Sequence, residues 1–287
     1  MKIEVLKPSG YCAGVAKAIK IAIKTKENNK EKNVVVLGML VHNEETLKYL
    51  NSLGINTLYD EKKSLIELAK NLKNNDLVIL TAHGHSASLE VYLQENNIEF
   101  VDTTCPFVKK TIDEIKSFLN KDKEIVYIGK KNHPEANAVL SLSNNIHLYE
   151  VDKNNLLSLK SNDPIIFSQT TFSNEDIKIE LENIKEHFSN ASFYGGICNS
   201  SQLRQNALIS LKQYPDVIII VGSRKSNNTN TLYSLAKSHY PKSKISFVEN
   251  EKSINKEDFA NANYVVISSG ASTPNELINR IVNKLSD

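Results

Sequence analysis

Residues 102–129 read DTTCPFVKKTIDEIKSFLNKDKEIVYIG, and this stretch decides the fold that the sequence predicts. An extended segment ends at Cys105, Pro106 opens a helical pattern, and an apolar run leads to Gly129. Proline suits the first turn of a helix, where its missing N–H is not needed. Apolar residues then recur on one helical face, namely Val108, Ile112, Ile115 and Leu119. The continuous run of Val and Ile is typical of a strand buried on both faces of a parallel sheet.

The same order of features occurs three times along the chain. Cys105 follows Cys12 by as many residues as Cys198 follows Cys105, and a helical pattern comes after each cysteine. The third helix is expected to turn Leu203, Ala207 and Leu211 to one face. Each helix leads to an apolar strand ending in glycine, and a polar loop and a second strand follow. The three glycine-ended strands are VVVLG at 34–38, IVYIG at 125–129 and VIIIVG at 217–222.

The repeat predicts an α/β fold of three pseudo-symmetric lobes, with mostly parallel sheets around a central cavity. We expect the lobes at residues 13–104, 105–197 and 198–287, the last completed by an N-terminal strand within residues 1–12. Ligands of open parallel sheets bind at the carboxyl ends of the strands, where the cysteines and polar loops of this chain lie. The loops of the three lobes are therefore expected to converge.

Composition narrows the class of protein. The chain has 287 residues, 40% hydrophobic and 24% charged, which is typical of a globular protein. Its 35 Lys and Arg against 33 Asp and Glu do not favour nucleic acid as a partner. We expect no membrane segment and no signal peptide, because long apolar runs are absent from the sequence. An odd number of cysteines, three, fits a reducing compartment, so the sequence predicts a cytoplasmic protein.

Three cysteines at the starts of helices indicate a metal site. Free N–H groups and the helix dipole stabilise a thiolate at that position. Three thiolates can bind Zn²⁺ with one position open, or an iron–sulfur cluster with one iron that lacks a protein ligand, and the spacing does not choose between them. Structural zinc is the weaker alternative because the sequence has no C-x₂-C pair. Three inert core cysteines are the remaining alternative.

The polar loops carry neutral hydrogen-bond donors that suit a phosphate or diphosphate held away from water. The sequence contains neither a P-loop nor a Gly-x-Gly-x-x-Gly motif. Glu135 is an acid in an otherwise neutral loop; burial would raise its pKa and make it a proton donor, whereas a solvated loop position would not. The donors are His42, His83, His133, Thr170, Thr171, Ser226, Asn228 and Ser272.

The chain resembles the 4-hydroxy-3-methylbut-2-enyl diphosphate reductases, the LytB family, over essentially its whole length. The reductases of this family complete the non-mevalonate route to isoprenoids. The resemblance rests on short motifs found in the family's order: GYCAGV, VHN, TAHGHS, DTTCP, NHPE, SQTT, the IC at 197–198, VGSRKSNNTN and SGAS.

The resemblance implies a 4Fe-4S cluster held by Cys12, Cys105 and Cys198, whose remaining iron binds the hydroxyl of an allylic diphosphate substrate. It implies reductive loss of that hydroxyl to give isopentenyl and dimethylallyl diphosphate, with electrons from a donor such as ferredoxin or flavodoxin. Catalytic roles are implied for Glu135, as proton donor, and for Thr170 and His133. The implied substrate-binding residues are His42, His83, His133, Thr170, Ser226, Asn227, Asn228 and Ser272.

Two positions depart from the family pattern, and two other functions compete. Tyr11 stands before the first cysteine where the family usually has phenylalanine, which keeps the ring. Asn227 stands where the family commonly has serine, so its amide would replace a hydroxyl as donor. A quinolinate synthase-like enzyme also combines three lobes with three cysteines, but it is not expected to carry NHPE together with SQTT. A non-catalytic iron–sulfur sensor of a phosphorylated metabolite would not need an acid such as Glu135.

Overall fold

The structure, a computed structural model, describes residues 1–151 and 159–286 and divides the chain into two compact units. The first unit consists of Met1–Ala16, Val41–Tyr49 and Cys198–Asp287, and the second of Lys17–Leu40 and Leu50–Ile197. The expected second and third lobes include residues 152–158 and 287, which lie outside the described residues. The lobe boundaries stay a prediction.

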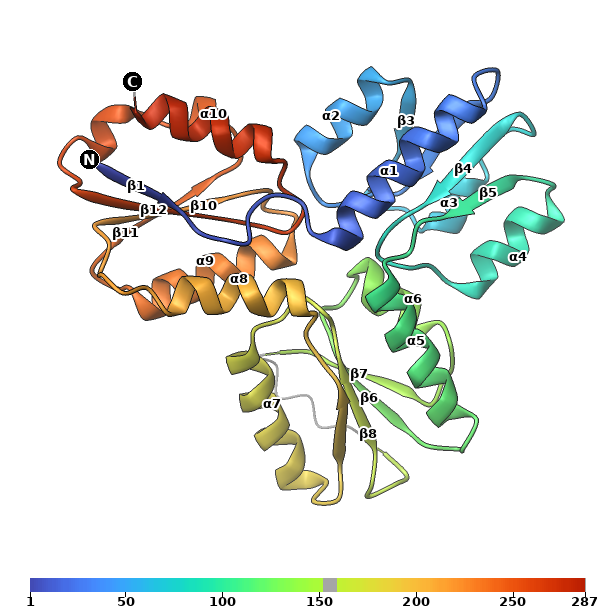
Figure 1. The fold of residues 1–287 in the computed structure, drawn as a ribbon. Coiled ribbons are helices and arrows are strands. Elements are labelled where there is room, and N and C mark those ends of the chain that lie inside the picture. The colour runs from blue at the N-terminus through green and yellow to red at the C-terminus, as the bar shows by residue number, and fades with distance from the viewer. Residues whose placement is uncertain (152–158, 287) are drawn as a thin grey trace. The chain divides into compact units, whose positions relative to one another are not determined.

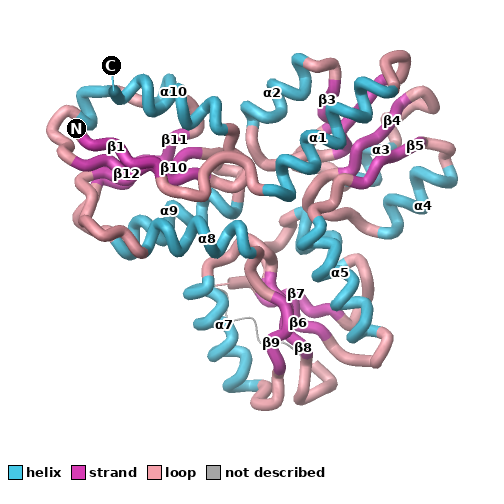
Figure 2. Tube along the Cα trace, in the orientation of Figure 1, coloured by secondary structure: helices cyan, strands magenta, loops and turns pink. Residues whose placement is uncertain are grey.

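The first unit contains one parallel sheet of four strands in the order β1-β12-β10-β11. Figure 2 shows these strands with α10 on one side and α8 and α9 on the other. The strands are β1 (Lys2–Val5), β10 (Val217–Val221), β11 (Lys244–Val248) and β12 (Tyr264–Ser269). The helices are α8 (Asn199–Ile209), α9 (Asn227–His239), α10 (Asn275–Ser286) and the 3-10 turns η1 (Glu251–Ser253) and η2 (Lys256–Phe259).

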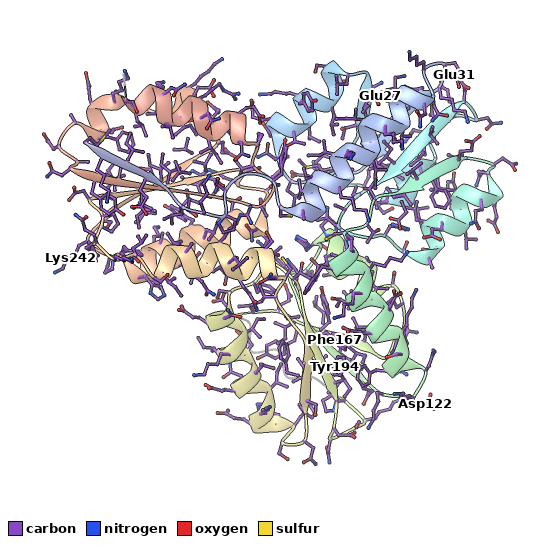
Figure 3. All side chains as sticks on the ribbon, in the orientation of Figure 1. Glu27, Glu31, Asp122, Phe167, Tyr194 and Lys242 are labelled. Carbon is purple, nitrogen blue, oxygen red and sulfur yellow. The ribbon has the colours of Figure 1, made fainter. Side chains whose placement is uncertain are left out.

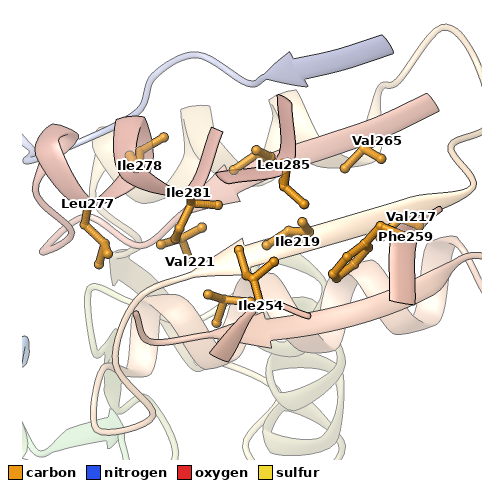
Figure 4. Close-up of a cluster of buried hydrophobic side chains, with 12 residues drawn as sticks. Val217, Ile219, Val221, Ile254, Phe259, Val265, Leu277, Ile278, Ile281 and Leu285 are labelled. Atoms are coloured by element: carbon orange, nitrogen blue, oxygen red, sulfur yellow. The ribbon is translucent and has the colours of Figure 1, made fainter. Parts of the chain in front are cut away.

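The central strand β10 is buried on both faces, as its apolar run predicts. Val217, Ile219 and Val221 pack in one cluster with residues of α10. Figure 4 shows Ile219 and Val221 beside Leu285 and Ile281 of that helix, and Val217 beside Phe259. The alternate residues Ile218 and Ile220 pack against α8 and α9. Burial of apolar side chains on both faces contributes on the order of 1.5–3 kcal/mol per large side chain.

The second unit contains two further parallel sheets, ordered β3-β2-β4-β5 and β7-β6-β8-β9. Their strands are β2 (Asn33–Leu37), β3 (Ile55–Leu58), β4 (Asp76–Leu80), β5 (Glu99–Asp102), β6 (Ile125–Ile128), β7 (Ile146–Tyr149), β8 (Ile165–Ser168) and β9 (Ser192–Gly195). The helices of this unit are α3 (Leu65–Ala69), α4 (Ala87–Glu95), α5 (Pro106–Leu119), α6 (Pro134–Leu140) and α7 (Asn174–His187). The ranges of α1 (Ala13–Asn28) and α2 (Glu44–Ser52) include residues of both units.

All three sheets repeat one strand order. Each glycine-ended strand lies at an inner position of its sheet. β2 lies between β3 and β4, β6 between β7 and β8, and β10 between β11 and β12. Figure 1 colours the chain from blue at the N-terminus to red at the C-terminus, and the blue strand β1 lies beside the red strand β12, with which it pairs. The α/β fold class with three parallel sheets is confirmed. Among the described residues, no helix is long and apolar enough to cross a membrane.

A close packing of aromatic rings requires a glycine at the edge of the third sheet. A Cβ on Gly195 would lie 2.3 Å from the ring of Phe167. Figure 3 labels Phe167 beside Tyr194, and their ring centroids are 5.7 Å apart. The strand pairing shifts register here, between Ile166 and Phe167. A side chain at position 195 would therefore force the buried ring to move.

The prediction for the face of α8 was wrong at Leu203, whose side chain is 48% exposed. Ala207 and Leu211 do pack against the core, although Leu211 lies beyond the end of the helix. The buried residues of α8 are mostly polar, and two of them make hydrogen bonds there: Ser201 accepts one from Asn228 of α9, and Arg204 donates one to Gly10 O. The buried residues are Ser201, Arg204, Gln205 and Leu208.

Candidate functional site

Each cysteine immediately precedes a helix, as the sequence predicts. Cys12 comes before α1, Cys105 before α5 and Cys198 before α8, and none of the three forms a disulfide. The unpaired N–H groups of a first helical turn favour an anionic sulfur. Cys12 and Cys198 belong to the first unit and Cys105 to the second.

The two sulfurs of the first unit accept backbone hydrogen bonds from their own helices. Val15 N donates to Cys12 Sγ and Ser201 N donates to Cys198 Sγ, each at 3.4 Å. The hydroxyl of Ser201 also lies 3.2 Å from Cys198 Sγ. Both sulfurs are thereby oriented by local structure before any ligand binds.

A chain of hydrogen bonds connects the two cysteines of the first unit. Cys12 N donates to Ala271 O at 2.9 Å, and Ala271 N donates to the side-chain oxygen of Asn228 at 3.0 Å. The Asn228 amide then donates to Ser201 Oγ at 2.8 Å, and Ser201 contacts Cys198. Asn228 is thus a buried link between the two cysteine-bearing segments, besides its predicted role as a substrate ligand.

Cys105 is fixed to the loop that carries His83. Its N–H donates to Ala82 O at 3.0 Å, and its carbonyl accepts a hydrogen bond from Lys109 N at 2.9 Å within α5. Ala82 follows β4 and directly precedes His83. The second unit therefore holds a predicted cluster ligand and a predicted substrate ligand on adjoining loops.

Glu135 is the most distinctive residue of the second unit. It lies in the first turn of α6 and is 3% exposed. Its Oε1 accepts hydrogen bonds from Thr170 N at 2.9 Å and from Tyr127 Oη at 3.1 Å. Thr170 Oγ1 lies 2.9 Å from the other carboxyl oxygen. Of the two alternatives that the sequence left open, a buried acid and a solvated loop glutamate, the structure shows the buried acid.

Burial changes the proton affinity of this acid. Desolvation raises the pKa of Glu135 to about 7, against the hydrogen bonds from Thr170 and Tyr127, which lower it. A carboxyl with this pKa is partly protonated at neutral pH and can give up a proton at little cost. The geometry and the pKa together suit a general acid.

His133 is positioned next to this acid by the same helix start. It is the N-cap of α6, and its Nδ1 accepts a hydrogen bond from Glu135 N at 3.2 Å. A neutral imidazole that accepts this hydrogen bond at Nδ1 carries its proton on Nε2. The ring of His83 lies edge-on to it at a centroid distance of 5.8 Å.

The remaining predicted substrate ligands lie in the first unit. Burial lowers the pKa of His42 to about 4, so its ring is neutral at neutral pH. Ser272 Oγ donates to His42 O at 3.2 Å. Ser226 caps α9 by accepting a hydrogen bond from Thr229 N, and Asn227 is the first residue of that helix. These groups are neutral donors at loop ends, the chemistry expected for an anion held without a lysine cluster.

The chemistry of the donor set fits an iron–sulfur cluster, which takes cysteine sulfurs as its protein ligands, each on a different iron. The three cysteines at helix starts supply ligands of this kind. Among the residues that the structure describes, no three His, Cys, Asp or Glu side chains are placed to hold one metal ion.

Tyr127 gives a first prediction. Tyr127→Phe removes a hydrogen bond that lowers the pKa of Glu135, so this pKa is expected to rise by about one unit. An acid catalyst acts while protonated, so the decline of kcat/KM at high pH is expected to move upward in a pH profile. Tyr149→Phe in the same sheet is the control, because the Tyr149 hydroxyl bonds to Glu180 instead. Equal profiles for the wild type and Tyr127→Phe would contradict the prediction.

Sequence reasoning missed three residues of these networks. Tyr127 lies in the apolar strand β6, where it was counted only as part of a buried run. Ser201 and Arg204 lie on α8, and the helical pattern drawn through Leu203 placed them off the buried face. The i, i+3 spacing of Cys198, Ser201 and Arg204 is the signal that could have found the last two.

Two curated relatives match nearly the whole chain. A 4-hydroxy-3-methylbut-2-enyl diphosphate reductase of Malacoplasma penetrans (strain HF-2) is 34% identical over 289 residues, with 98% of this chain and 96% of that protein covered. The protein of the same name from Campylobacter fetus subsp. fetus (strain 82-40) is 33% identical, with 100% and 98% covered. A family model described as LytB protein matches residues 3–286.

Two solved structures share the fold. The E-1-hydroxy-2-methyl-but-2-enyl-4-diphosphate reductase from Plasmodium falciparum superposes with a TM-score of 0.86 at 24% identity, over 99% of this chain and 88% of that one. An (E)-4-hydroxy-3-methyl-but-2-enyl diphosphate reductase, described as the terminal enzyme of the non-mevalonate pathway, gives a TM-score of 0.69 at 27% identity. The second match covers 100% of this chain and 99% of that one.

Proposed function

The chain belongs to the LytB protein family, and from that premise we propose that it reduces 4-hydroxy-3-methylbut-2-enyl diphosphate to isopentenyl and dimethylallyl diphosphate. The reaction breaks the allylic C–O bond, consumes two electrons and two protons, and releases water. This is the terminal step of the non-mevalonate pathway, as in the second structural relative. Membership of the family removes the quinolinate synthase-like alternative.

The observation that carries the proposal is the environment of Glu135. A hydroxyl leaves an allylic carbon readily only when it departs as water, so the reaction needs a proton at that oxygen. A buried acid with a pKa of about 7, held by Thr170 and Tyr127, supplies it at neutral pH. A sensor that only binds a metabolite has no use for such a group.

Cys12, Cys105 and Cys198 are proposed as the ligands of a 4Fe-4S cluster. The support is their chemistry and position: three cysteines outside any disulfide, each at the start of a helix in one of three equivalent repeats. When bound, such a cluster supplies single electrons and a Lewis-acidic iron without a protein ligand. The electrons are proposed to come from a protein such as ferredoxin or flavodoxin, and the cytoplasmic location stays a prediction.

The diphosphate is proposed to bind neutral donors at the loop ends. His133, which accepts a hydrogen bond from Glu135 N and lies edge-on to the ring of His83, is proposed to hold the substrate together with His83. Thr170, whose hydroxyl contacts Glu135, is proposed to orient the hydroxyl end of the substrate. The other proposed contacts are His42, Ser226, Asn227, Asn228 and Ser272.

Proton transfer is then a local event in the second unit. Protonated Glu135 gives its proton to the departing hydroxyl oxygen, and the resulting carboxylate is stabilised by the N–H and hydroxyl of Thr170 and by Tyr127. Because these donors are already in place, the carboxylate forms without reorganisation of the loop. Burial of Glu135 and Thr170 also keeps bulk water from the acid.

The proposal is tested by an anaerobic assay. Protein purified and reconstituted without oxygen is mixed with a chemical reductant and the hydroxylated allylic diphosphate, and the products are separated by chromatography. Formation of isopentenyl and dimethylallyl diphosphate is expected. Absence of both products from protein that holds iron and sulfide would contradict the proposed reaction.

A further inference from the structure

Helix α8 of the first unit carries a buried arginine without an acidic partner. Arg204 is 2% exposed, and within the part of the chain that the structure describes no carboxylate pairs with it. Arginine is almost never fully buried unless it is paired. Its charge remains on the side chain because arginine is not deprotonated in proteins. The site therefore holds a buried cation that requires an anion.

The guanidinium connects the two cysteine-bearing segments of this unit. Nη2 donates to Gly10 O at 2.6 Å, and Gly10 lies two residues before Cys12. Nη1 donates to Ser200 O at 3.1 Å and to Ser200 Oγ at 2.5 Å, two residues after Cys198. Gly10 suits this contact because its φ of +75° turns the chain and a Cβ there would collide with Asn275.

One donor of the guanidinium is left over. Nε is buried and has no hydrogen-bond partner. Burial lowers the pKa of Arg204, whereas negative charge on Cys12 and Cys198 raises it. The contacts with the Gly10 and Ser200 segments, together with this charge interaction, place the guanidinium near both sulfurs, and a buried donor without a partner is destabilising until one binds.

We propose that Arg204 is a positioning residue of the cysteine site: it holds the Gly10 and Ser200 segments together and keeps a permanent positive charge beside Cys12 and Cys198. This inference rests on the proposed function, in which both cysteines bind an iron–sulfur cluster. One-electron reduction makes such a cluster more negative, so a neighbouring positive charge raises its reduction potential. A hydrogen bond from Nε–H to a sulfur acts in the same direction.

The test compares Arg204→Met, which removes the charge at similar length, with Arg204→Lys, which retains it. The control is Arg280→Met on α10, where the arginine is 42% exposed and pairs with Glu45 and Glu251. Iron and sulfide per chain and the midpoint potential are measured on anaerobically reconstituted protein by a redox titration followed by electron paramagnetic resonance. Circular dichroism checks the fold of each variant.

Arg204→Met is expected to lower the equilibrium constant for one-electron reduction of the cluster about tenfold, which is a fall of ~59 mV in its midpoint potential. Arg204→Lys is expected to keep a midpoint potential close to that of the wild type. If Arg204→Met does not load iron, Arg204→Lys is expected to load it. Full loading of Arg204→Met with an unchanged potential would overturn the proposal, as would equal loss of iron from both variants. Wild-type protein without iron or sulfide would overturn the proposed cluster itself, so the two failures are distinguishable.

Discussion

Cys105→Ser is expected to abolish the reductase activity. It is also expected to weaken cluster binding at least about a hundredfold, so that anaerobically reconstituted protein holds little iron. Serine is nearly the size of cysteine, and its N–H can still donate to Ala82 O, so the start of α5 is retained. A hydroxyl is not a thiolate ligand, however, and two cysteines do not hold a cluster that needs three. The measurement is iron and sulfide per chain, together with turnover.

The control for this experiment is the neighbouring residue. Thr104→Ser keeps the hydroxyl that bonds to Asp102 and changes only a methyl group. It is expected to load iron as the wild type does. Wild-type iron content and activity in Cys105→Ser would show that this cysteine is not a ligand.

Glu135→Gln is expected to lower kcat by about 10²–10⁴-fold with no change in iron content. Glutamine is isosteric, so its amide oxygen can still accept hydrogen bonds from Thr170 N and Tyr127 Oη, and its NH₂ can face Thr170 Oγ1. What it lacks is the acidic proton. The loss of turnover is therefore chemical rather than structural, and single-turnover kinetics on loaded protein measures it.

The control is another glutamate of the second unit. Glu182 lies exposed on α7, and Glu182→Gln is expected to leave both kcat and its pH dependence unchanged. In the wild type, kcat/KM should fall as pH rises above about 7, because the acid is then deprotonated. Retention of wild-type turnover by Glu135→Gln would refute the assigned acid and leave the cluster ligands untouched.

The fold could be predicted because its information is local. The apolar residues of β2, β6 and β10 follow one another without the alternating polar residues of an amphipathic strand. Each of these strands stands between a helix that begins after a cysteine and a polar loop. The equal spacing of Cys12, Cys105 and Cys198 then made the three repeats visible without any knowledge of contacts. The strand orders follow the same plan in all three sheets.

The site was predictable only in part, because its energetics depend on contacts between distant residues. Glu135 could be selected as an unusual loop acid, but its raised pKa depends on burial beside Tyr127 and Thr170, which no spacing reveals. Arg204 is hidden for the same reason: on a helical pattern it resembles a surface charge, and only the contact with Gly10, far away in sequence, makes it part of a buried site.

The measurement that tests the central claim most directly is Mössbauer spectroscopy of wild-type protein reconstituted with ⁵⁷Fe, recorded before and after addition of the allylic diphosphate. The claim is that three cysteines hold one iron–sulfur cluster with an iron open to substrate. The account predicts a cluster spectrum in which one iron site changes when substrate is added, and no cluster spectrum in Cys105→Ser. A wild-type spectrum without a cluster would contradict this claim. A cluster spectrum in which no iron site changes when substrate is added would also contradict it.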